Sequence, residues 1–566
     1  MKRLILFATI NSILFSLFAQ EALKSTEEEY YDFLSLQDIV ERPTLGYRTL
    51  SDSEWNFALD EDGNSLSDSD GNIWKNNNLG KKHTLWQSES SGENWFTRGF
   101  DHSLTLKIYG PEWYNSYNTA APYGQNDGAL WQGKGYNTSL TGGARLEGYG
   151  FEVTVKPQVS FSQNLEFDYI TPNYSGSNYE DKAALYGYYG VSSIDAPQRF
   201  GDSAFGTFDW GDTEIRWNWR TFTTGFGTQA IWLGPAQLNP ILHSNNAASY
   251  PKFDIGLRKT ALYMPHFGWY LGAIEMRGWM GYLSESDYFD NDDSNDHNRI
   301  NGFTVSYELP FPKGLSIGLA KVCLTKWGAF EIKYLNPFYD QNGGVGTTIG
   351  EDQKMSFFAD WIISTGGIEI YGEAGIDDYL QGGWFTGLIR YPFDSLVWTL
   401  GLKKSFCMYA AKKIYGEIVL EFSDMEEPRN KISANQSYFF NSHYQITQGY
   451  TNSGQYLGSA LANGGNAQTL IYNVYYPKGK TSLLLQRSNP DDTYSYANLD
   501  NENQTYKGYG LIGLSNTYFI LPELQCTIAL TYQRIINSLY FNTSNTSQGT
   551  ALLHNVCLTF GCIYNF

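Results

Sequence analysis

Carboxylates at strand spacing are the first residues in this sequence that could do chemistry. Glu369, Glu373 and Asp377 share one face if their segment is extended, and carboxylates on one face could share a proton or a cation. Inside a barrel, however, such charges more commonly form an ion-pair network that fills or lines the interior, so we predict a blocked or narrow pore rather than a catalytic cleft. The same interpretation covers the mixed charges Glu214, Arg216, Arg220, Glu275 and Arg277.

Other catalytic patterns are missing from the sequence. The seven histidines show no metal or relay spacing, and no GxSxG or HExxH string occurs. We therefore predict no catalytic, cofactor-binding or metal residues, and a protein that is not an enzyme. A surface enzyme whose residues converge from distant strands stays open as an alternative.

An acidic run in residues 285–296 is the strongest candidate for ligand binding. Its carboxylates could bind calcium or bridge anionic sugars through divalent ions, although a solvated loop is the more common explanation. Residues 60–72 form a second oxygen-rich loop, which lacks the distal Glu of a full calcium loop. We expect no cofactor, with calcium at these acidic loops as the alternative. The candidate ligands are Asp287, Asp290, Asp292 and Asp293.

Composition limits the class of protein. The net charge of -20 argues against nucleic acid as a partner. Aromatic residues make up 16% of the chain and there are 57 glycines, which favours sheet with girdles of amphipathic rings. The five cysteines form no CxxC pair, and we interpret them as small apolar residues rather than metal ligands or a disulfide framework.

The elements that must position these residues are strands. Apolar and polar residues alternate in residues 151–162, 414–422 and 524–533, and again in the last sixteen residues, which end on Phe566. Alternation alone also fits a soluble sandwich, but the aromatic load, an N-terminal signal pattern and the terminal Phe favour a membrane barrel. The sequence therefore predicts an all-β, transmembrane antiparallel β-barrel of roughly 18 strands.

Domain boundaries follow from the same patterns. Two positive charges, an apolar core and a small residue predict a signal peptide over residues 1–19. Residues 20–98 are expected to form a small periplasmic helical and loop segment, because Ser25 and Glu28 make a capping box before an apolar run. Residues 99–566 are expected to form the outer-membrane barrel.

Several segments of the chain resemble the capsule assembly protein Wzi family. The most specific is residues 126–143, supported by residues 231–240, 243–246, 334–338 and 368–378. The resemblance implies an 18-stranded outer-membrane barrel that holds capsular or other surface polysaccharide at the cell surface as a lectin, without catalysis. A porin or diffusion channel for sugars or ions is the alternative.

The resemblance also directs attention to Trp131, which lies within residues 126–143 among Gly128, Gly133 and Gly135. Trp131 could bind a sugar ring or pack as a plug, and packing is the favoured interpretation; the glycines are expected to allow tight turns or close backbone packing. The expected partners are surface polysaccharide, outer-membrane lipid, and the outer-membrane assembly machinery through Phe566, with the protein itself a monomer.

Overall fold

The computed structural model describes most of the chain and leaves several ranges undescribed. The described residues are 18–20, 23–58, 73–74, 83–89, 100, 103–170, 172, 185–189, 191–328, 350–377, 396–427, 440–461, 463–498, 506–540 and 552–566. The predicted signal peptide falls almost wholly outside them, as do the acidic loop 60–72 and the segment 334–338 that contributes to the family resemblance.

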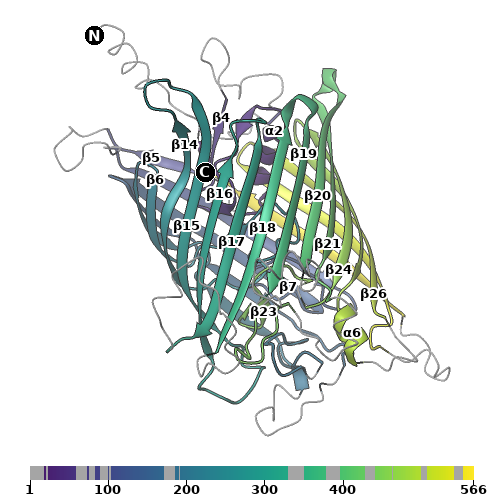
Figure 1. Ribbon diagram of the computed structural model, residues 1–566. Coiled ribbons are helices and arrows are strands. Elements are labelled where there is room, and N and C mark those ends of the chain that lie inside the picture. Colours follow the sequence, from purple (N-terminus) through teal and green to yellow (C-terminus); the bar gives the residue numbers. More distant parts are fainter. Residues whose placement is uncertain are drawn as a thin grey trace.

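One closed antiparallel sheet forms the body of the protein (Figure 1). Eighteen strands close it within the described residues, when β8 with β9 and β10 with β11 are each counted as one interrupted strand. They are β6 (Thr105–Asn118), β7 (Gly135–Gly148), β8 (Phe151–Val155), β9 (Gln158–Ser162), β10 (Phe205–Asp209), β11 (Glu214–Trp219), β12 (Phe222–Gly227), β14 (Lys252–Tyr263), β15 (Tyr270–Ser284), β16 (His297–Glu308), β17 (Leu315–Lys326), β18 (Glu351–Ile363), β19 (Ile368–Asp377), β20 (Val397–Tyr409), β21 (Ile414–Asp424), β24 (Asn466–Tyr476), β25 (Gly479–Asn489), β26 (Gly508–Leu521), β27 (Leu524–Ile536) and β28 (Leu552–Tyr564).

The last strand closes the barrel, as its pattern predicted. β28 pairs with β27 on one side and with β6 on the other, where the register runs from Cys557 opposite Asn118 to Ile563 opposite Glu112. An unpaired edge cannot stand in a bilayer, because no water is there to satisfy its backbone groups. The all-β barrel predicted from the sequence is therefore confirmed.

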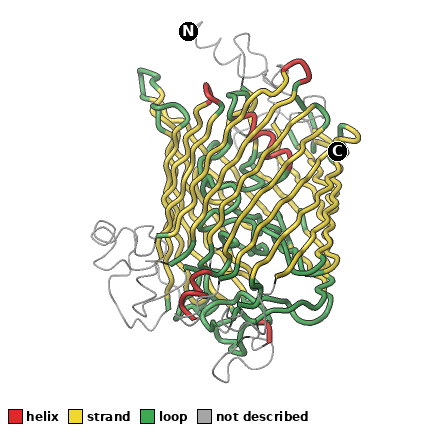
Figure 2. The backbone as a smooth tube through the Cα atoms, turned by 90° about the vertical axis from the view of Figure 1, so that its right-hand side faces the viewer, coloured by secondary structure: helices red, strands yellow, loops and turns green. Residues whose placement is uncertain are grey.

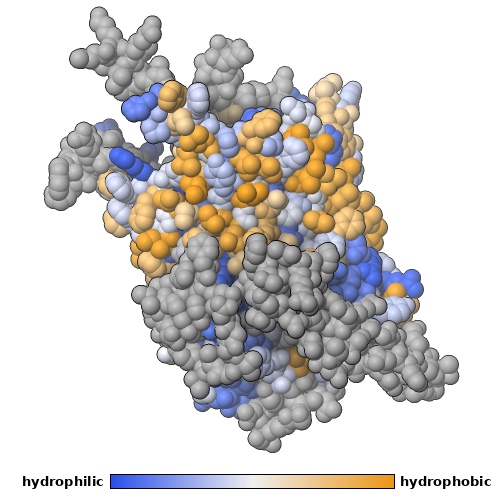
Figure 3. All heavy atoms as spheres, in the orientation of Figure 1, coloured by the Kyte–Doolittle hydropathy of each residue, from blue (hydrophilic) through white to orange (hydrophobic). Residues whose placement is uncertain are grey.

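Alternating side chains give the wall two chemically different faces. On β27, Ile528 and Leu530 are 64% and 50% exposed on the outside, whereas the polar side chain of Gln533, on the inner face, is buried. Figure 3 shows the resulting apolar band across the visible wall. Connections at one end are short turns, such as Met264–Gly268, and long loops gather at the other end. Figure 2 shows the C-terminus at the short-turn end. Short turns mark the periplasmic end of such barrels, and long loops the extracellular end.

The N-terminal segment lies inside the short-turn end. Helix α2 (Thr26–Ser35) begins after Ser25, whose hydroxyl accepts a hydrogen bond from the backbone N–H of Glu28 at 3.0 Å, so the expected helix start is confirmed. Tyr30, Phe33 and Trp74 pack on Tyr475 of β24 and Phe519 of β26. No helix among the described residues is long and apolar enough to cross a membrane.

Short strands accompany this helix: β1 (Phe18–Gln20), β2 (Val40–Glu41), β3 (Tyr47–Arg48) and β4 (Glu54–Phe57). β1 and β2 both pair with β4. A further strand, β5 (Thr84–Gln87), pairs with the start of β6. The boundary between residues 98 and 99 stays a prediction.

The expectation for the cysteines was wrong for two of the five. Cys526 and Cys562 form a disulfide, whereas Cys323, Cys407 and Cys557 are free. The two bonded residues lie directly opposite each other on β27 and β28. They lie 36 positions apart in the sequence, so only the pairing of these two strands reveals their proximity.

Candidate functional site

Segments from both ends of the barrel meet inside the lumen. The connection between β12 and β14 enters from the long-loop end, and its short strand β13 (Trp232–Leu233) pairs with β3 of the N-terminal segment. Trp232 lies opposite Arg48 and Leu233 opposite Tyr47. This connection contains residues 231–240 and 243–246, two of the segments that carry the family resemblance. We call residues 228–251 the inward loop.

Carboxylates on the barrel wall hold the inward loop by its backbone. Glu421 of β21 accepts hydrogen bonds from the N–H groups of Gln237 at 2.7 Å and of Asn239 at 2.9 Å. Glu373 of β19 accepts from the N–H groups of Ala236 and Ile241, both at 2.9 Å. Charge-assisted bonds of this kind are stronger than bonds between neutral groups, so the wall fixes the loop in place.

An ion-pair network ties the N-terminal segment to the wall. Asp52 of that segment bonds Arg277 of β15 at 2.7 Å and Arg258 of β14 at 2.8 Å. Arg277 also bonds Asp254 at 2.6 Å, and Asp254 bonds Arg216 at 2.5 Å. Arg216 and Arg277 are buried, so each would carry an uncompensated charge if it lost its partners. The predicted network in the lumen is therefore present.

Apolar side chains pack in the lumen between the ion-pair network and the long-loop end. Tyr47, Trp279 of β15, Val322 of β17 and Tyr450 belong to one buried cluster. Tyr450 comes from residues 440–461, a second connection that packs inward from the long-loop end and includes β22 (Thr451–Asn452) and β23 (Gln455–Tyr456). The side of the lumen formed by β14 to β21 is thus packed like a protein core.

The three candidate carboxylates of β19 have separate partners. Glu369 bonds Arg42 at 2.6 Å and lies 3.2 Å from Lys403. Glu373 holds the inward loop, and Asp377 bonds Lys354 at 2.5 Å. Because each carboxylate is used by a different structural contact, the three do not form an acid/base group.

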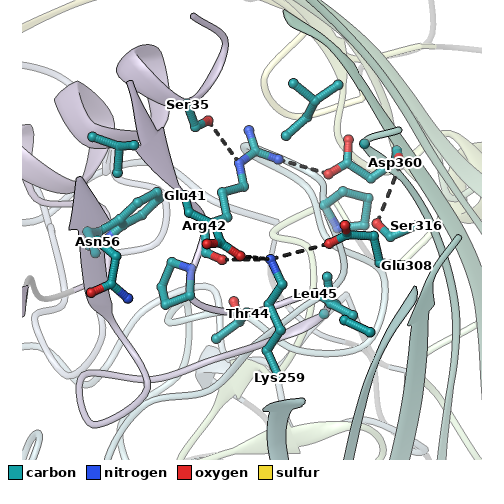
Figure 4. A pocket seen from close by; sticks show the side chains of 18 of the residues that line it. Ser35, Glu41, Arg42, Thr44, Leu45, Asn56, Lys259, Glu308, Ser316 and Asp360 are labelled. Carbon is teal, nitrogen blue, oxygen red and sulfur yellow. Dashed lines mark hydrogen bonds and ion pairs between the residues drawn. The ribbon is translucent and has the colours of Figure 1, made fainter. Parts of the chain in front are cut away.

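A cavity of about 960 Å³ opens where the N-terminal segment meets the wall at the short-turn end (Figure 4). Arg42 bonds Asp360 at 2.8 Å, and Lys259 bonds Glu41 at 2.9 Å and Glu308 at 3.3 Å. Figure 4 shows these partners pointing toward one another across the cavity. Both labelled cations have carboxylate partners, so the arrangement serves the attachment of the segment.

The predicted acidic ligands lie in the connection between β15 and β16. Asp287 and Asp293 are exposed. Asp290 accepts a bond from the N–H of Asp292, and Asp292 accepts from the hydroxyl of Ser294 at 2.6 Å. Among the residues that the structure describes, no three His, Cys, Asp or Glu side chains converge as a metal site. The calcium expectation stays a prediction.

Glu285, the first residue of the acidic run, lies just beyond the end of β15. Burial, with nearby carboxylates led by Asp195, raises the pKa of Glu285 to about 10. Burial also raises the pKa of Asp195 to about 6, against hydrogen bonds from Ser286 that lower it. The two loops therefore hold acidic groups close together, and the charged groups that shift the pKa of Glu285 are all carboxylates.

Trp131 lies at the long-loop end, half-buried, with its ring centroid 4.9 Å from that of Phe200. A Cβ on Gly133 would come within 2.9 Å of the Trp131 ring nitrogen, so Gly133 permits the close packing that was predicted. Gly128 and Gly135 have φ angles of 60° and 94°, which glycine adopts readily. Sequence reasoning missed Phe200, which comes from a different loop; recurring aromatic residues in the loops were the signal available.

Comparison with known proteins supports the architecture. No protein-family model and no curated protein sequence matches the chain. Among solved structures, the chain is similar to Wzi of Escherichia coli, an outer-membrane protein involved in group 1 capsule assembly and described as a carbohydrate-binding β-barrel. The TM-score is 0.52 at 12% identity, covering 89% of this chain and 98% of Wzi.

Two other solved structures align over most of the chain. OccD3 of Pseudomonas aeruginosa gives a TM-score of 0.36 at 11% identity, over 86% of this chain and 93% of its own. A BenF-like porin from Pseudomonas fluorescens gives 0.35 at 10% identity, over 81% and 99%. The closed sheet, its outer apolar band and the likeness to Wzi together show that this chain has the fold of the 18-stranded outer-membrane β-barrels.

Proposed function

We propose that this protein is a non-enzymatic surface anchor that binds capsular or other exported polysaccharide through its long-loop end. The observation that carries the proposal is the meeting of β3 and β13 inside the lumen, which places chain from both ends across the interior. A barrel filled in this way has its accessible surface at the loops rather than along a pore. The carbohydrate binding of Wzi, a protein of the same fold, supports the proposal.

The second candidate, a diffusion channel for sugars or ions, requires an open lumen. A channel needs a continuous aqueous path, whereas Glu373 and Glu421 fix the inward loop to the wall. Planar-bilayer recording on the refolded barrel separates the two candidates. We expect no stable conductance from the full chain, and measurable conductance when residues 231–245 are replaced by a short Gly–Ser linker.

Binding is tested directly on surface polysaccharide extracted from the producing cells. Immobilised polysaccharide and refolded barrel should give saturable binding, with heat-unfolded barrel as the control. A parallel measurement in millimolar calcium tests whether the acidic loop of residues 285–296 contributes. Steady conductance of the full chain together with absent binding would establish the channel instead.

The remaining partners are proposals of the same kind. We propose that outer-membrane lipid covers the apolar band, that the chain works as a monomer, and that the assembly machinery recognises Phe566. Phe566 is 50% exposed, and its ring lies against Tyr564 at a centroid distance of 5.0 Å. The exposure of this ring in the folded barrel supports the proposal that Phe566 is available to a recognition protein.

A further inference from the structure

Six aromatic rings from three loops form a continuous row at the long-loop end. Neighbouring centroids lie 4.9 Å apart from Trp131 to Phe200, then 5.7, 5.6, 6.4 and 5.6 Å along the remaining members. We call this set the aromatic row; its members in order are Trp131, Phe200, Tyr288, Tyr186, Tyr169 and Phe167. We infer that the aromatic row binds an uncharged glycan chain, an inference that rests on the proposed function and names its ligand class.

Ring faces suit a sugar because each pyranose has a face of C–H groups that packs on the electron-rich face of an aromatic ring. Five of the six rings are half-buried, and Tyr186 is 9% exposed. A half-buried ring keeps apolar surface at the protein boundary while its other side is held by neighbours. Tyr288 meets Phe200 and Tyr186 edge to face, at interplanar angles of 78° and 83°, so the half-buried rings on either side of Tyr186 offer separate surfaces for separate sugars rather than one flat platform.

Polar side chains order the described part of residues 163–204 and join it to residues 285–296, and the backbone N–H of Leu165 bonds the carbonyl oxygen of Lys134, in the Trp131 loop, at 2.9 Å. The Asn164 amide donates to the carbonyl oxygens of Phe200 at 2.9 Å and Gly201 at 3.0 Å. The Gln198 amide donates to the carbonyl oxygens of Ile170 and Gly187. Asp195 accepts from the N–H and the hydroxyl of Ser286, both at 2.6 Å. These bonds preorganise the aromatic row, which lowers the entropy lost when a ligand binds.

Charge around the aromatic row selects against acidic glycans. Exposed carboxylates beside it are Glu166, Asp168, Asp202 and Asp287. In the described parts of the three loops (residues 119–134, 163–204 and 285–296), Lys134 and Arg199 are the only Lys or Arg; Arg199 is buried, and the Lys134 ammonium donates to the carbonyl oxygen of Glu166 at 2.8 Å. An anionic polysaccharide would meet four exposed carboxylates against the single accessible ammonium of Lys134, whereas a neutral chain would meet hydrogen-bond acceptors for its hydroxyls.

A second aromatic cluster at the same end differs in how its rings are used. The hydroxyls of Tyr188 and Tyr189 donate to the carboxylate of Asp491 at 2.8 and 2.7 Å. The hydroxyl of Tyr540 donates to the backbone carbonyl oxygen of Asp491 at 3.3 Å. All three rings are buried. This cluster braces the loops against one another, whereas the aromatic row leaves ring surface at the boundary.

The test measures binding of the full-length refolded barrel to the neutral and acidic fractions of the producing cells' surface polysaccharide, separated by anion exchange. We expect the wild type to bind the neutral fraction. Phe200→Leu and Tyr288→Leu, which keep apolar volume but remove a ring face, should each weaken binding about tenfold, the effect of losing one stacking contact of about 1.4 kcal/mol. Phe200→Tyr, which keeps the ring, should bind like the wild type.

Tyr444→Leu is the matched control, because Tyr444 is 74% exposed at the same end and lies outside the aromatic row. Heat-modifiable migration on gels checks that every variant is folded. Wild-type binding that survives both leucine substitutions, or that is confined to the acidic fraction, would overturn the assignment of the aromatic row. Absence of wild-type binding to either fraction would instead remove the proposed function itself.

Discussion

The two sides of the barrel interior are built on different principles. The wall from β14 to β21 is packed against the N-terminal segment and the inward loop, with buried ion pairs and apolar contacts. On the wall from β25 to β28, inward residues such as Ser515, Ala529 and Thr559 are small, uncharged and only half-buried. Half-burial of residues that face the lumen means that room for solvent remains beside them.

The open space is confined to the middle of that second wall. Toward the short-turn end Thr517 and Gln525 are buried, and toward the long-loop end Ile535 and Asn555 are buried. The interior is therefore not filled uniformly: attachment of the inner segments is densest on β14 to β21, although Lys480 of β25 also forms an ion pair with Glu29. The comparison teaches that charges on the wall of this barrel hold inner chain segments in place, and that the middle of the second wall, where the inward residues named above are uncharged, is lined by small side chains.

The largest expected effect comes from removing a buried ion-pair partner that holds the N-terminal segment. Arg277→Ala should lower the free energy of unfolding by about 3–5 kcal/mol, because Asp52 and Asp254 would lose a buried partner. Urea titration of the refolded barrel measures the change. Ser515→Ala on the other wall is the control and should stay within about 0.5 kcal/mol. Equal effects at the two positions would remove the distinction between the walls.

Neutralising a carboxylate that holds the inward loop should have a smaller effect. Glu421→Gln keeps the shape of the side chain but loses the charge-assisted bonds to the N–H groups of residues 237–239, at a cost of about 1.5–3 kcal/mol. Hydrogen exchange at those amides should accelerate. Glu166→Gln, at an exposed loop position, provides the control. Unchanged exchange at residues 237–239 would show that the loop is held by other contacts.

Adding volume tests the two walls with the same substitution. Ala320 of β17 is 1% exposed within the apolar cluster, whereas Ala529 of β27 is half-buried. Ala320→Leu should destabilise by about 1–3 kcal/mol through overpacking, and Ala529→Leu by less than about 1 kcal/mol because solvent can be displaced. Thermal unfolding followed by gel migration compares the pair. A large loss at Ala529 would mean that the second wall is also tightly packed.

A pH-dependent effect contrasts a buried carboxyl among like charges, Glu285, with a carboxylate that accepts hydrogen bonds, Asp292. The folded-state pKa of Glu285, raised by burial to about 10, exceeds its ordinary 4.5, so the folded state holds a proton that the unfolded state releases. Stability should therefore fall as pH rises from 4.5 toward 10, and Glu285→Gln should remove that fall.

Unfolding midpoints at mildly acidic and mildly alkaline pH measure this effect. Asp292→Asn is the control, because hydrogen bonds from Ser294 lower the pKa of Asp292 from 3.8 and leave it ionised across this range. A Glu285→Gln variant with the pH dependence of the wild type would show that the carboxyl is solvated in the folded protein.

Predictability from sequence differed between the wall and the lumen. Alternation placed Leu530 outside and Gln533 inside correctly, because a strand sends successive side chains to opposite faces whatever its neighbours are. The same reasoning recognised Glu369 and Arg277 as interior charges. It could not name their partners, since Arg42 and Asp52 lie in a segment hundreds of residues away.

The candidate binding residues show the same limit. Trp131 was singled out, but Phe200 and Tyr288 were not, because loops 163–205 and 285–296 converge only in the folded chain. Asp287, Asp290, Asp292 and Asp293 are close in sequence, yet within the described residues no three ligand side chains converge there. Proximity along the chain was a poor guide to convergence at the loops.

The sequence by itself determined the strands, their two faces and the closure of the barrel. The alternation of apolar and polar residues is a local property, and it places apolar side chains toward lipid and polar side chains toward the lumen. Tertiary structure alone decided that Cys526 bonds Cys562, that β3 meets β13, and that the inward loop rests on Glu373 and Glu421. Those contacts depend on strand register and on where loops fold, and both are fixed by the packing of residues that are distant in the chain.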